Sequence, residues 1–196
     1  LRMPDSSYIC DFTYEGCKTT NGPYPVTSGG LPGAYDENTE CQTLEIRLKD
    51  KACDVRLSLY YTVFNECDVI TRRAVLVNED QRELRIRKLM SMMLDLNVGP
   101  LALLTLDGGW IREAHKHTRI LQPGIYVNSS TTGGSGNRHN PGIILFEPDG
   151  GEDHGRAYGF NLVYSGNHYE AVELSSSGTV RVMSGINPHC FDWPLA

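Results

Sequence analysis

Acidic residues are the first candidates for chemistry in this sequence, because the chain carries 24 aspartates and glutamates. Two facing carboxyl groups about 5 to 9.5 Å apart can cleave a glycosidic bond, one as acid and the other as nucleophile or base. Spacing along the chain does not reveal such a pair, and most of the acids fall in predicted turns or on charged strand faces. We therefore expect solvated surface groups, and we assign no catalytic residue.

Histidines form the second group of candidates. His115 and His117 are two residues apart, so on a strand their side chains would share one face and could hold a metal ion. His139 and His154 fall in two glycine-rich loops. The sequence has no His-Glu-x-x-His or Asp-x-Asp-x-Asp-Gly motif, and a His-x-His pair without a third ligand is usually ordinary surface. We predict no metal site.

Nucleophile and phosphate motifs are absent, whereas aromatic residues are more suggestive. Segment 132–137 lacks the Gly-Lys-Ser/Thr ending of a phosphate-binding loop, and Ser165 lies in Tyr-Ser-Gly rather than in a nucleophile elbow. An aromatic face can stack on the C–H face of a hexose. The aromatic candidates are Trp110, Trp193, Tyr158, Tyr164 and Tyr169. Because tryptophan is usually packed inside, the sequence favours a core role for both tryptophans.

Charge and hydropathy bear on the classes of partner. The formal net charge is −6, and an acidic chain repels a phosphate backbone, so we expect no nucleic-acid partner. The most basic run, Arg82, Arg85, Arg87 and Lys88, is interpreted as a solvated strand face. No apolar stretch reaches the ~20 residues that cross a bilayer, and no secretory signal pattern is visible. We expect no membrane partner and a cytoplasmic location.

The cysteines are too sparse for a disulfide scaffold, since the chain has six in 196 residues. No pair has Cys-x-x-Cys spacing, which argues against structural zinc. We interpret them as mostly reduced thiols, and a bridge between Cys10 and Cys17 stays open as an alternative.

A period-two pattern defines the elements that must position these groups. Leu44, Ile46 and Leu48, for example, alternate with charged residues. Strands are predicted at 43–48, 55–63, 69–77, 84–96, 101–106, 125–129, 143–147, 158–164, 171–174 and 180–183. Residues 1–38 are rich in turns, so any strands there should be short. Segment 84–96 keeps one apolar parity except at Lys88, which favours one long strand over a helix.

About ten strands with hairpin-length connections and no convincing helix predict an all-β fold. At 196 residues and 40% hydrophobic composition, the chain can bury a core. No repeat is visible, which argues against propellers and solenoids. We therefore predict one large antiparallel β-sandwich spanning residues 1–196.

Several short segments, taken in order, resemble the N-terminal domain of glycoside hydrolase family 36, the α-galactosidase and raffinose-type enzymes. They are Gly-Leu-Pro-Gly-Ala-Tyr at 30–35, Thr-Leu-Glu-Ile at 43–46, Tyr-Thr-Val-Phe at 61–64, Asp-Val-Ile-Thr-Arg at 68–72, Met-Ser-Met-Met-Leu-Asp-Leu at 90–96, Gly-Trp-Ile-Arg-Glu at 109–113, His-Asn-Pro at 139–141, Glu-Asp-His-Gly at 152–155, Tyr-Gly-Phe at 158–160, Tyr-Ser-Gly-Asn at 164–167, Gly-Ile-Asn-Pro at 185–188 and Phe-Asp-Trp at 191–193. Each is weak alone, but their order and spacing cover nearly all of 30–193.

The resemblance implies a β-supersandwich, followed in the full protein by a (β/α)8 catalytic barrel and a C-terminal β-domain. Two aspartates of the barrel would hydrolyse terminal α-1,6-galactosides such as melibiose and raffinose with retention, without nucleotide, flavin or metal cofactors. The family's Lys-Trp-Asp nucleophile segment does not occur here, so this chain is expected to be inactive alone. The family's domain packs on the barrel, supports assembly of a homo-oligomer (a tetramer), and can lend loop residues to a neighbouring subunit's pocket.

Two residues are named as candidate substrate-binding groups through the resemblance. Asp11, followed by Phe12, stands where the family has an Asp-Phe/Tyr-Arg segment near the sugar pocket, although Thr13 replaces the arginine. Trp110 lies in the segment that is similar to the family's Ala-Trp-x-Arg-Glu. Two further departures, Gly142 after Asn-Pro and Pro194 in the closing strand, leave the expected fold unchanged.

Two alternative functions stay open. The sandwich and its tryptophans would also suit an independent carbohydrate-binding module, which should bind a sugar by itself. An aldose mutarotase with a related supersandwich would need a histidine and a glutamate facing one pocket, and His139 and Glu113 could supply these types.

Overall fold

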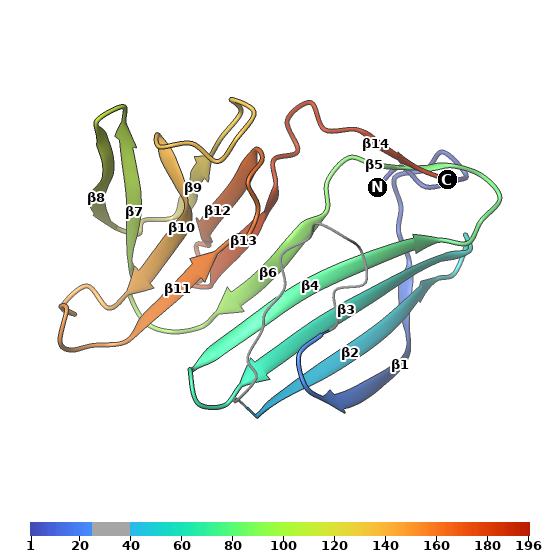
Figure 1. Ribbon diagram of the computed structural model, residues 1–196, viewed down its shortest axis with the longest axis horizontal. Helices are drawn as coiled ribbons and strands as arrows, with labels where there is room; N and C mark the ends of the chain where they lie inside the picture. The colour runs from blue at the N-terminus through green and yellow to red at the C-terminus, as the bar shows by residue number, and fades with distance from the viewer. Residues whose placement is uncertain (25–39) are drawn as a thin grey trace. The chain divides into compact units, whose positions relative to one another are not determined.

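The fold is built from antiparallel strands (Figure 1). The computed structural model describes residues 1–24 and 40–196, and these residues form fourteen strands and no helix. The motif at 30–35 lies outside the described residues. The chain divides into two compact units, Leu1–Ser91 with Cys190–Ala196 (unit 1) and Met92–His189 (unit 2). The prediction of an all-β antiparallel fold is confirmed, and the two units are described separately.

Unit 1 contains one sheet of four long strands. These are β1 (Phe12–Asn21), β2 (Cys41–Asp50), β3 (Val55–Phe64) and β4 (Val69–Asn78), in the order β1-β2-β3-β4. The register places Ile46 beside Leu59, and Leu59 beside Ala74, so the apolar parity noted in the sequence forms one face of the sheet. The predicted strands at 43–48, 55–63 and 69–77 are thereby confirmed.

The first strand is longer than the sequence predicted, since β1 has ten residues in a region where only short strands were expected. β1 lies at the sheet edge and pairs with β2, with a bulge between Tyr14 and Gly16. Most of its side chains are exposed, so its sequence need not alternate between apolar and polar residues. Pairing with β2, rather than a local pattern, makes this segment a strand.

The core of unit 1 lies where the terminal segments meet one end of the sheet. Met3, Cys53, Val55 and Leu84 are buried there, and Phe12 and Leu76 are among the side chains that pack against them. Two short strands, β5 (Leu84–Ile86) and β14 (Trp193–Leu195), pair with each other beside the two chain ends (Figure 1). Pro194 is tolerated because β14 has β5 as its one neighbour in this sheet.

The segment 84–96 is not one strand, so that prediction is wrong. β5 ends at Ile86 and pairs with β14, whereas β6 (Met90–Leu96) joins a sheet with β13. The chain must turn between two different partners, and the break falls at 87–89. Lys88, which interrupted the apolar parity in the sequence, lies at this break.

Unit 2 is a sandwich of two four-stranded sheets, with orders β11-β10-β7-β8 and β6-β13-β12-β9. The remaining strands are β7 (Ala102–Gly109), β8 (Arg112–Ile120), β9 (Gly124–Ser129), β10 (His139–Phe146), β11 (Ala157–Asn161), β12 (His168–Leu174) and β13 (Val180–Ile186). Both sheets supply the core. Its buried members are Leu101, Leu103, Leu121, Ile143, Leu145, Val172, Val180 and Val182.

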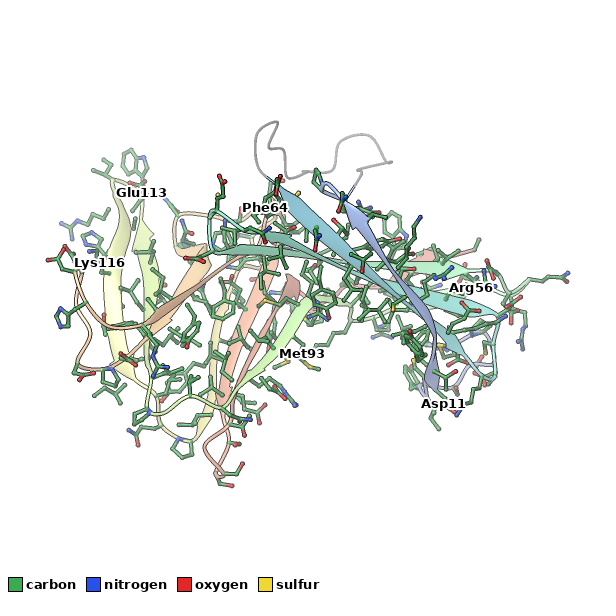
Figure 2. All side chains as sticks on the ribbon, turned by 90° about the horizontal axis from the view of Figure 1, so that it is seen from below. Asp11, Arg56, Phe64, Met93, Glu113 and Lys116 are labelled. Atoms are coloured by element: carbon green, nitrogen blue, oxygen red, sulfur yellow. The ribbon has the colours of Figure 1, made fainter. Side chains whose placement is uncertain are left out.

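Strand β8 was missed by the sequence analysis. All nine of its residues are exposed, so the alternation that marks a half-buried strand is missing. β8 is the edge strand beside β7, and Figure 2 shows its Glu113 and Lys116 at the margin of unit 2. Charged side chains at such an edge discourage pairing with another chain.

Three further observations concern the cysteines, the basic run and membrane-spanning helices. The six cysteines are free thiols, so Cys10 and Cys17 are not bridged. In the basic run, Arg82 forms an ion pair with Asp80, and Arg85 forms one with Asp192. Within residues 1–24 and 40–196, no helix is long and apolar enough to span a membrane.

Candidate functional site

The β7–β8 turn presents an aromatic side chain to solvent. Trp110 is 85% exposed and its neighbour Ile111 is 72% exposed. Ile111 has a φ of 65°, which is unfavourable for a β-branched residue and indicates a constrained turn. At Gly108 a Cβ atom would collide with the carbonyl oxygen of Arg112, so the turn requires glycine there. The expectation that both tryptophans lie in the core is wrong, because Trp193 is also 59% exposed.

A polar cluster lies at the base of this turn. His139 Nδ1 is 2.9 Å from Asp107 Oδ1, and the Thr105 hydroxyl donates to Asp107 Oδ2 at 2.7 Å. Burial raises the pKa of the Asp107 carboxyl, but the hydrogen bonds from Thr105 and His139 outweigh burial, so this pKa lies below its ordinary value. An ionised Asp107 therefore holds the imidazole of His139 in one orientation.

A cavity of about 330 Å³ adjoins this cluster and is lined by residues 129–132 and 136–139. Its loop is held by two hydrogen bonds: the Ser130 hydroxyl donates to the Gly134 carbonyl, and the Gly133 N–H donates to Asn167 Oδ1. The loop also reaches β8, since Asn137 Nδ2 lies 3.4 Å from Glu113 Oε1. We call residues 105–115 and 129–139 the hairpin end of unit 2. It combines an exposed aromatic group with polar groups, which suits contact with a sugar or with a protein surface.

The other histidine hypotheses gain no support from this geometry. His115 and His117 lie on β8 and are exposed, and no cluster of three metal-ligating side chains occurs among the residues that the structure describes. His139 is paired with Asp107, whereas Glu113 contacts Asn137. The histidine and glutamate of the mutarotase alternative therefore each have another polar partner.

Asp11 lies in unit 1, just before β1 (Figure 2). Its exposed carboxylate pairs with Lys51 Nζ at 3.1 Å, and its backbone N–H donates to Asp50 Oδ2 at 2.7 Å. Trp110 belongs to unit 2. The two candidate substrate-binding residues thus sit in separate units, and their role stays a prediction.

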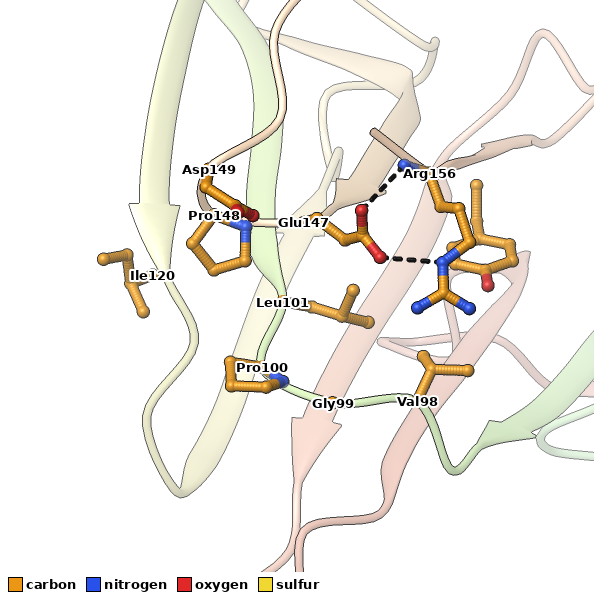
Figure 3. A pocket seen from close by; sticks show the side chains of 10 residues that line it. Val98, Gly99, Pro100, Leu101, Ile120, Glu147, Pro148, Asp149 and Arg156 are labelled. Carbon is orange, nitrogen blue, oxygen red and sulfur yellow. Dashed lines mark hydrogen bonds and ion pairs between the residues drawn. The ribbon is translucent and has the colours of Figure 1, made fainter. Parts of the chain in front are cut away.

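A second cavity, of about 600 Å³, lies at the opposite end of the β11-β10-β7-β8 sheet from the hairpin end (Figure 3). It is lined by Val98, Gly99, Pro100, Leu101, Ile120, Glu147, Pro148, Asp149, Arg156 and Tyr158. Arg156 Nε lies 2.7 Å from Glu147 Oε1, and hydrogen bonds from Arg156 keep the pKa of Glu147 below its ordinary value. Glu147 is therefore ionised and is a poor general acid. Its ion pair with Arg156 joins the two ends of the loop at 148–155.

Buried carboxyl groups are the remaining candidates for glycosidase chemistry. Two occur in the described part of the chain, Asp50 in unit 1 and Glu170 in unit 2. The Asp50 carboxylate accepts hydrogen bonds from the backbone N–H groups of Asp11, Ala52 and Cys53, which makes it a structural group. Neither unit therefore brings two buried carboxyl groups together within residues 1–24 and 40–196.

Comparison with protein-family models gives one match over the whole chain. The model described as the glycosyl hydrolase family 36 N-terminal domain matches residues 1–196. The resemblance seen in the short sequence segments is confirmed by this match.

Curated relatives are α-galactosidases. The chain is 35% identical over 195 residues to a probable alpha-galactosidase G of Emericella nidulans, covering 100% of this chain and 26% of the relative. It is 34% identical over 196 residues to the alpha-galactosidase AgaA of Geobacillus stearothermophilus, covering 100% of this chain and 27% of the relative. The chain therefore spans about a quarter of the length of these relatives.

Solved structures agree in fold. The crystal structure of the α-galactosidase AgaA of Geobacillus stearothermophilus has a TM-score of 0.93 and 34% identity, over 98% of this chain and 27% of that one. The α-galactosidase of Lactobacillus brevis has a TM-score of 0.94 and 33% identity, over 100% of this chain and 26% of that one. The predicted β-sandwich class is confirmed by these neighbours.

Proposed function

This chain belongs to glycosyl hydrolase family 36, as the N-terminal domain of its α-galactosidases, and on that premise we propose that it is a non-catalytic scaffold within a retaining α-galactosidase. The whole protein would hydrolyse terminal α-1,6-galactosides of the melibiose and raffinose type in a (β/α)8 barrel. Variants of the Geobacillus stearothermophilus enzyme AgaA have been crystallised with raffinose and with stachyose, which supports this substrate class.

The observation that carries the proposal is that the two buried carboxyl groups of the described residues do not form a pair. Retaining cleavage needs two carboxyl groups about 5 to 5.5 Å apart on either side of one bond. Asp50 is occupied by backbone N–H groups, and Glu170 lies in the other unit. A relative's length is about four times that of this chain, which leaves ample room for a catalytic domain elsewhere.

The direct test is hydrolysis of a chromogenic α-galactoside by this chain alone and by the whole protein that carries it. We expect turnover from the whole protein and none from the chain. Trace activity in the chain is checked with Glu147→Gln and Glu170→Gln, which should leave a contaminant unaffected. Turnover by the chain that either substitution abolishes would refute the proposal.

We assign the hairpin end a role in assembly with the barrel and with other subunits of a homo-tetramer, where Trp110 would contact the partner or its galactoside. A large aromatic side chain that is 85% exposed is typical of residues that dominate interfaces. Trp110→Ala in the whole protein should weaken assembly or raise KM about tenfold. The control is Ile125→Ala, an exposed position on β9. Equal effects of both substitutions, measured by light scattering and kinetics, would contradict this assignment.

Asp11 is proposed to act near the sugar pocket in the same whole protein. Asp11→Asn removes the charge that pairs with Lys51 and keeps the shape of the side chain. We expect a higher KM with an unchanged unfolding midpoint, and Lys51→Met serves as the control for loss of the ion pair alone. Identical KM values for wild type and Asp11→Asn would remove Asp11 from the substrate site.

A carbohydrate-binding module is the second candidate, favoured by the exposure of both tryptophans. Calorimetric titration of the chain with raffinose distinguishes the two functions. A scaffold should show no binding, whereas a module should show binding that Trp110→Ala or Trp193→Ala abolishes.

A further inference from the structure

The interior of unit 2 changes from apolar to polar along its strands. In the β6-β13-β12-β9 sheet, Val172 lies opposite Val182, and both belong to the apolar core. Two residues earlier on β12, and therefore on the same face, Glu170 lies between Asn128 of β9 and Ser184 of β13. His168 lies two residues before Glu170 on β12, again on the same face. We call Asn128, His168, Glu170 and Ser184 the polar row; their exposed fractions are 6%, 0%, 1% and 4%.

Within the described part of the chain, most polar side-chain atoms of this polar row form no hydrogen bond. Asn128 Nδ2 donates to Glu170 Oε2 at 2.9 Å and to the Asn140 carbonyl at 2.6 Å. Five buried atoms have no hydrogen-bond partner among residues 1–24 and 40–196: Asn128 Oδ1, Glu170 Oε1, Ser184 Oγ and both ring nitrogens of His168. Buried polar groups in folded proteins are almost always paired, with protein or with an internal ligand.

We propose that the polar row binds ordered water molecules inside the sandwich of unit 2. Ser184 and one ring nitrogen of His168 are donors, whereas Asn128 Oδ1 and the second ring nitrogen are acceptors. Water serves both kinds of group, and internal water in proteins makes about three hydrogen bonds to such partners. A metal ion would satisfy the acceptors and leave the donors unpaired. It would also meet a single carboxyl group, that of Glu170, in the row.

The charges around Glu170 favour a neutral, hydrated site. Burial raises the pKa of Glu170 to about 7, and the hydrogen bond from Asn128 offsets this in part. His168 lies on the same strand as Glu170, and burial, together with His139 of β10, lowers its pKa, which favours the neutral imidazole. The facing sheet contributes His139 of β10 and Asp107 of β7, which pair with each other, whereas Ser184 of β13 is uncharged. The protonated Glu170 can then donate a hydrogen bond to water.

Holding this proton links the stability of unit 2 to pH. The ordinary pKa of Glu170 is 4.5 and the folded value is about 7, so the folded protein keeps a proton that the unfolded chain releases. This contribution to stability is complete below pH 4.5, falls as pH rises from 4.5, and is lost above about 7. Between these values the equilibrium constant for unfolding should rise up to about tenfold per pH unit.

A high-resolution crystal structure of the unaltered protein that carries this chain tests the site itself. We expect solvent density within about 3.2 Å of Glu170 Oε1, Ser184 Oγ and a ring nitrogen of His168. A row without such density would overturn the proposal. A peak with anomalous scattering and metal-like ligand distances would replace water with a cation, and would overturn it equally.

Unfolding of the same protein by urea at a series of pH values from 4.5 to 8 tests the coupling. Glu170→Gln keeps the size of the side chain and cannot titrate, so its stability should fall less, relative to wild type, as pH rises across this range. Glu173→Gln, on the same strand but with the opposite parity, is the matched control and should keep the wild-type slope. Equal slopes for Glu170→Gln and wild type would refute the protonated site. If Glu170→Gln does not fold, the solvent density in the unaltered protein decides.

Discussion

The two units of this chain bury their apolar residues in different ways. Unit 2 packs two sheets face to face, and eight apolar side chains from both sheets form its core. Unit 1 has longer strands, but among its described residues the core cluster has four buried members, gathered where the terminal segments meet one end of the sheet. Strand length and core size are therefore separate properties: a core needs a second layer, and a long sheet does not provide one by itself.

Unit 1 relies more on hydrogen bonds made inside its sheet and turns. Asp50 accepts hydrogen bonds from two N–H groups of the β2–β3 turn and from that of Asp11. The hydroxyls of Thr43 and Thr62 lie 2.8 Å apart in the interior of the sheet. Unit 2 also has buried polar groups, but most polar atoms of its polar row have no partner among the residues that the structure describes. The comparison predicts that packing substitutions dominate in unit 2 and polar substitutions in unit 1.

The largest effect is expected from Leu145→Ala in unit 2. Leu145 is 0% exposed between the two sheets, and its truncation leaves a cavity that should cost about 3–5 kcal/mol. Its neighbour Ile144 is 39% exposed with the opposite parity on β10, so Ile144→Ala should cost much less. Urea unfolding with hydrogen exchange measures both, and similar losses would break the comparison.

Asp50→Ala in unit 1 comes next. It removes the acceptor of three backbone N–H groups at a residue that is 3% exposed, with an expected cost of about 3 kcal/mol. Asp54→Ala removes an exposed carboxylate that pairs with Lys49 and should have little effect. The comparison between the units is sharpened if Asp50→Ala speeds up hydrogen exchange in unit 1 before it does so in unit 2. It is weakened if both units lose protection together.

Thr62→Val should have a smaller effect, of about 1 kcal/mol. Thr43 Oγ1 donates to the Gly22 carbonyl at 2.8 Å, so it accepts the hydrogen bond of the Thr62 hydroxyl. Valine keeps the shape of threonine and removes this donor. Thr20→Val, at an exposed position on β1, is the control, and thermal unfolding of the two variants should differ in midpoint.

The smallest effect is expected from Arg181→Ala on the surface of unit 2. Arg181 forms two hydrogen bonds of 2.7 Å with Asp95, and these lower the pKa of that carboxyl. Both side chains are about half exposed, so water and salt screen the pair. The unfolding midpoint should stay close to that of wild type in high salt. A large loss there would mean that Arg181 acts through packing rather than charge.

Sequence patterns predicted the strands with one solvent face and one buried face, such as β10 and β13, because alternation is their direct consequence. They failed for β8, which is exposed on both faces, and for 84–96, where two short strands share one parity but not one partner. At the candidate site, the sequence singled out Trp110 and His139. It did not single out Asp107, whose importance comes from a contact with a residue 32 positions away. It also passed over Glu170, which directly precedes the predicted strand at 171–174 and was counted among the solvated acids.

The sequence by itself determined the class of the fold and the family, because side-chain alternation and the order of short motifs are local properties of the chain. Only the tertiary structure decided which side chains are buried. Residue type predicted a core role for Trp110 and a solvated role for Glu170. The structure shows the reverse, because Trp110 is 85% exposed and Glu170 is 1% exposed. The physical reason is that burial depends on what packs opposite a residue. For these two positions that neighbourhood is a turn open to solvent and the interior between two sheets.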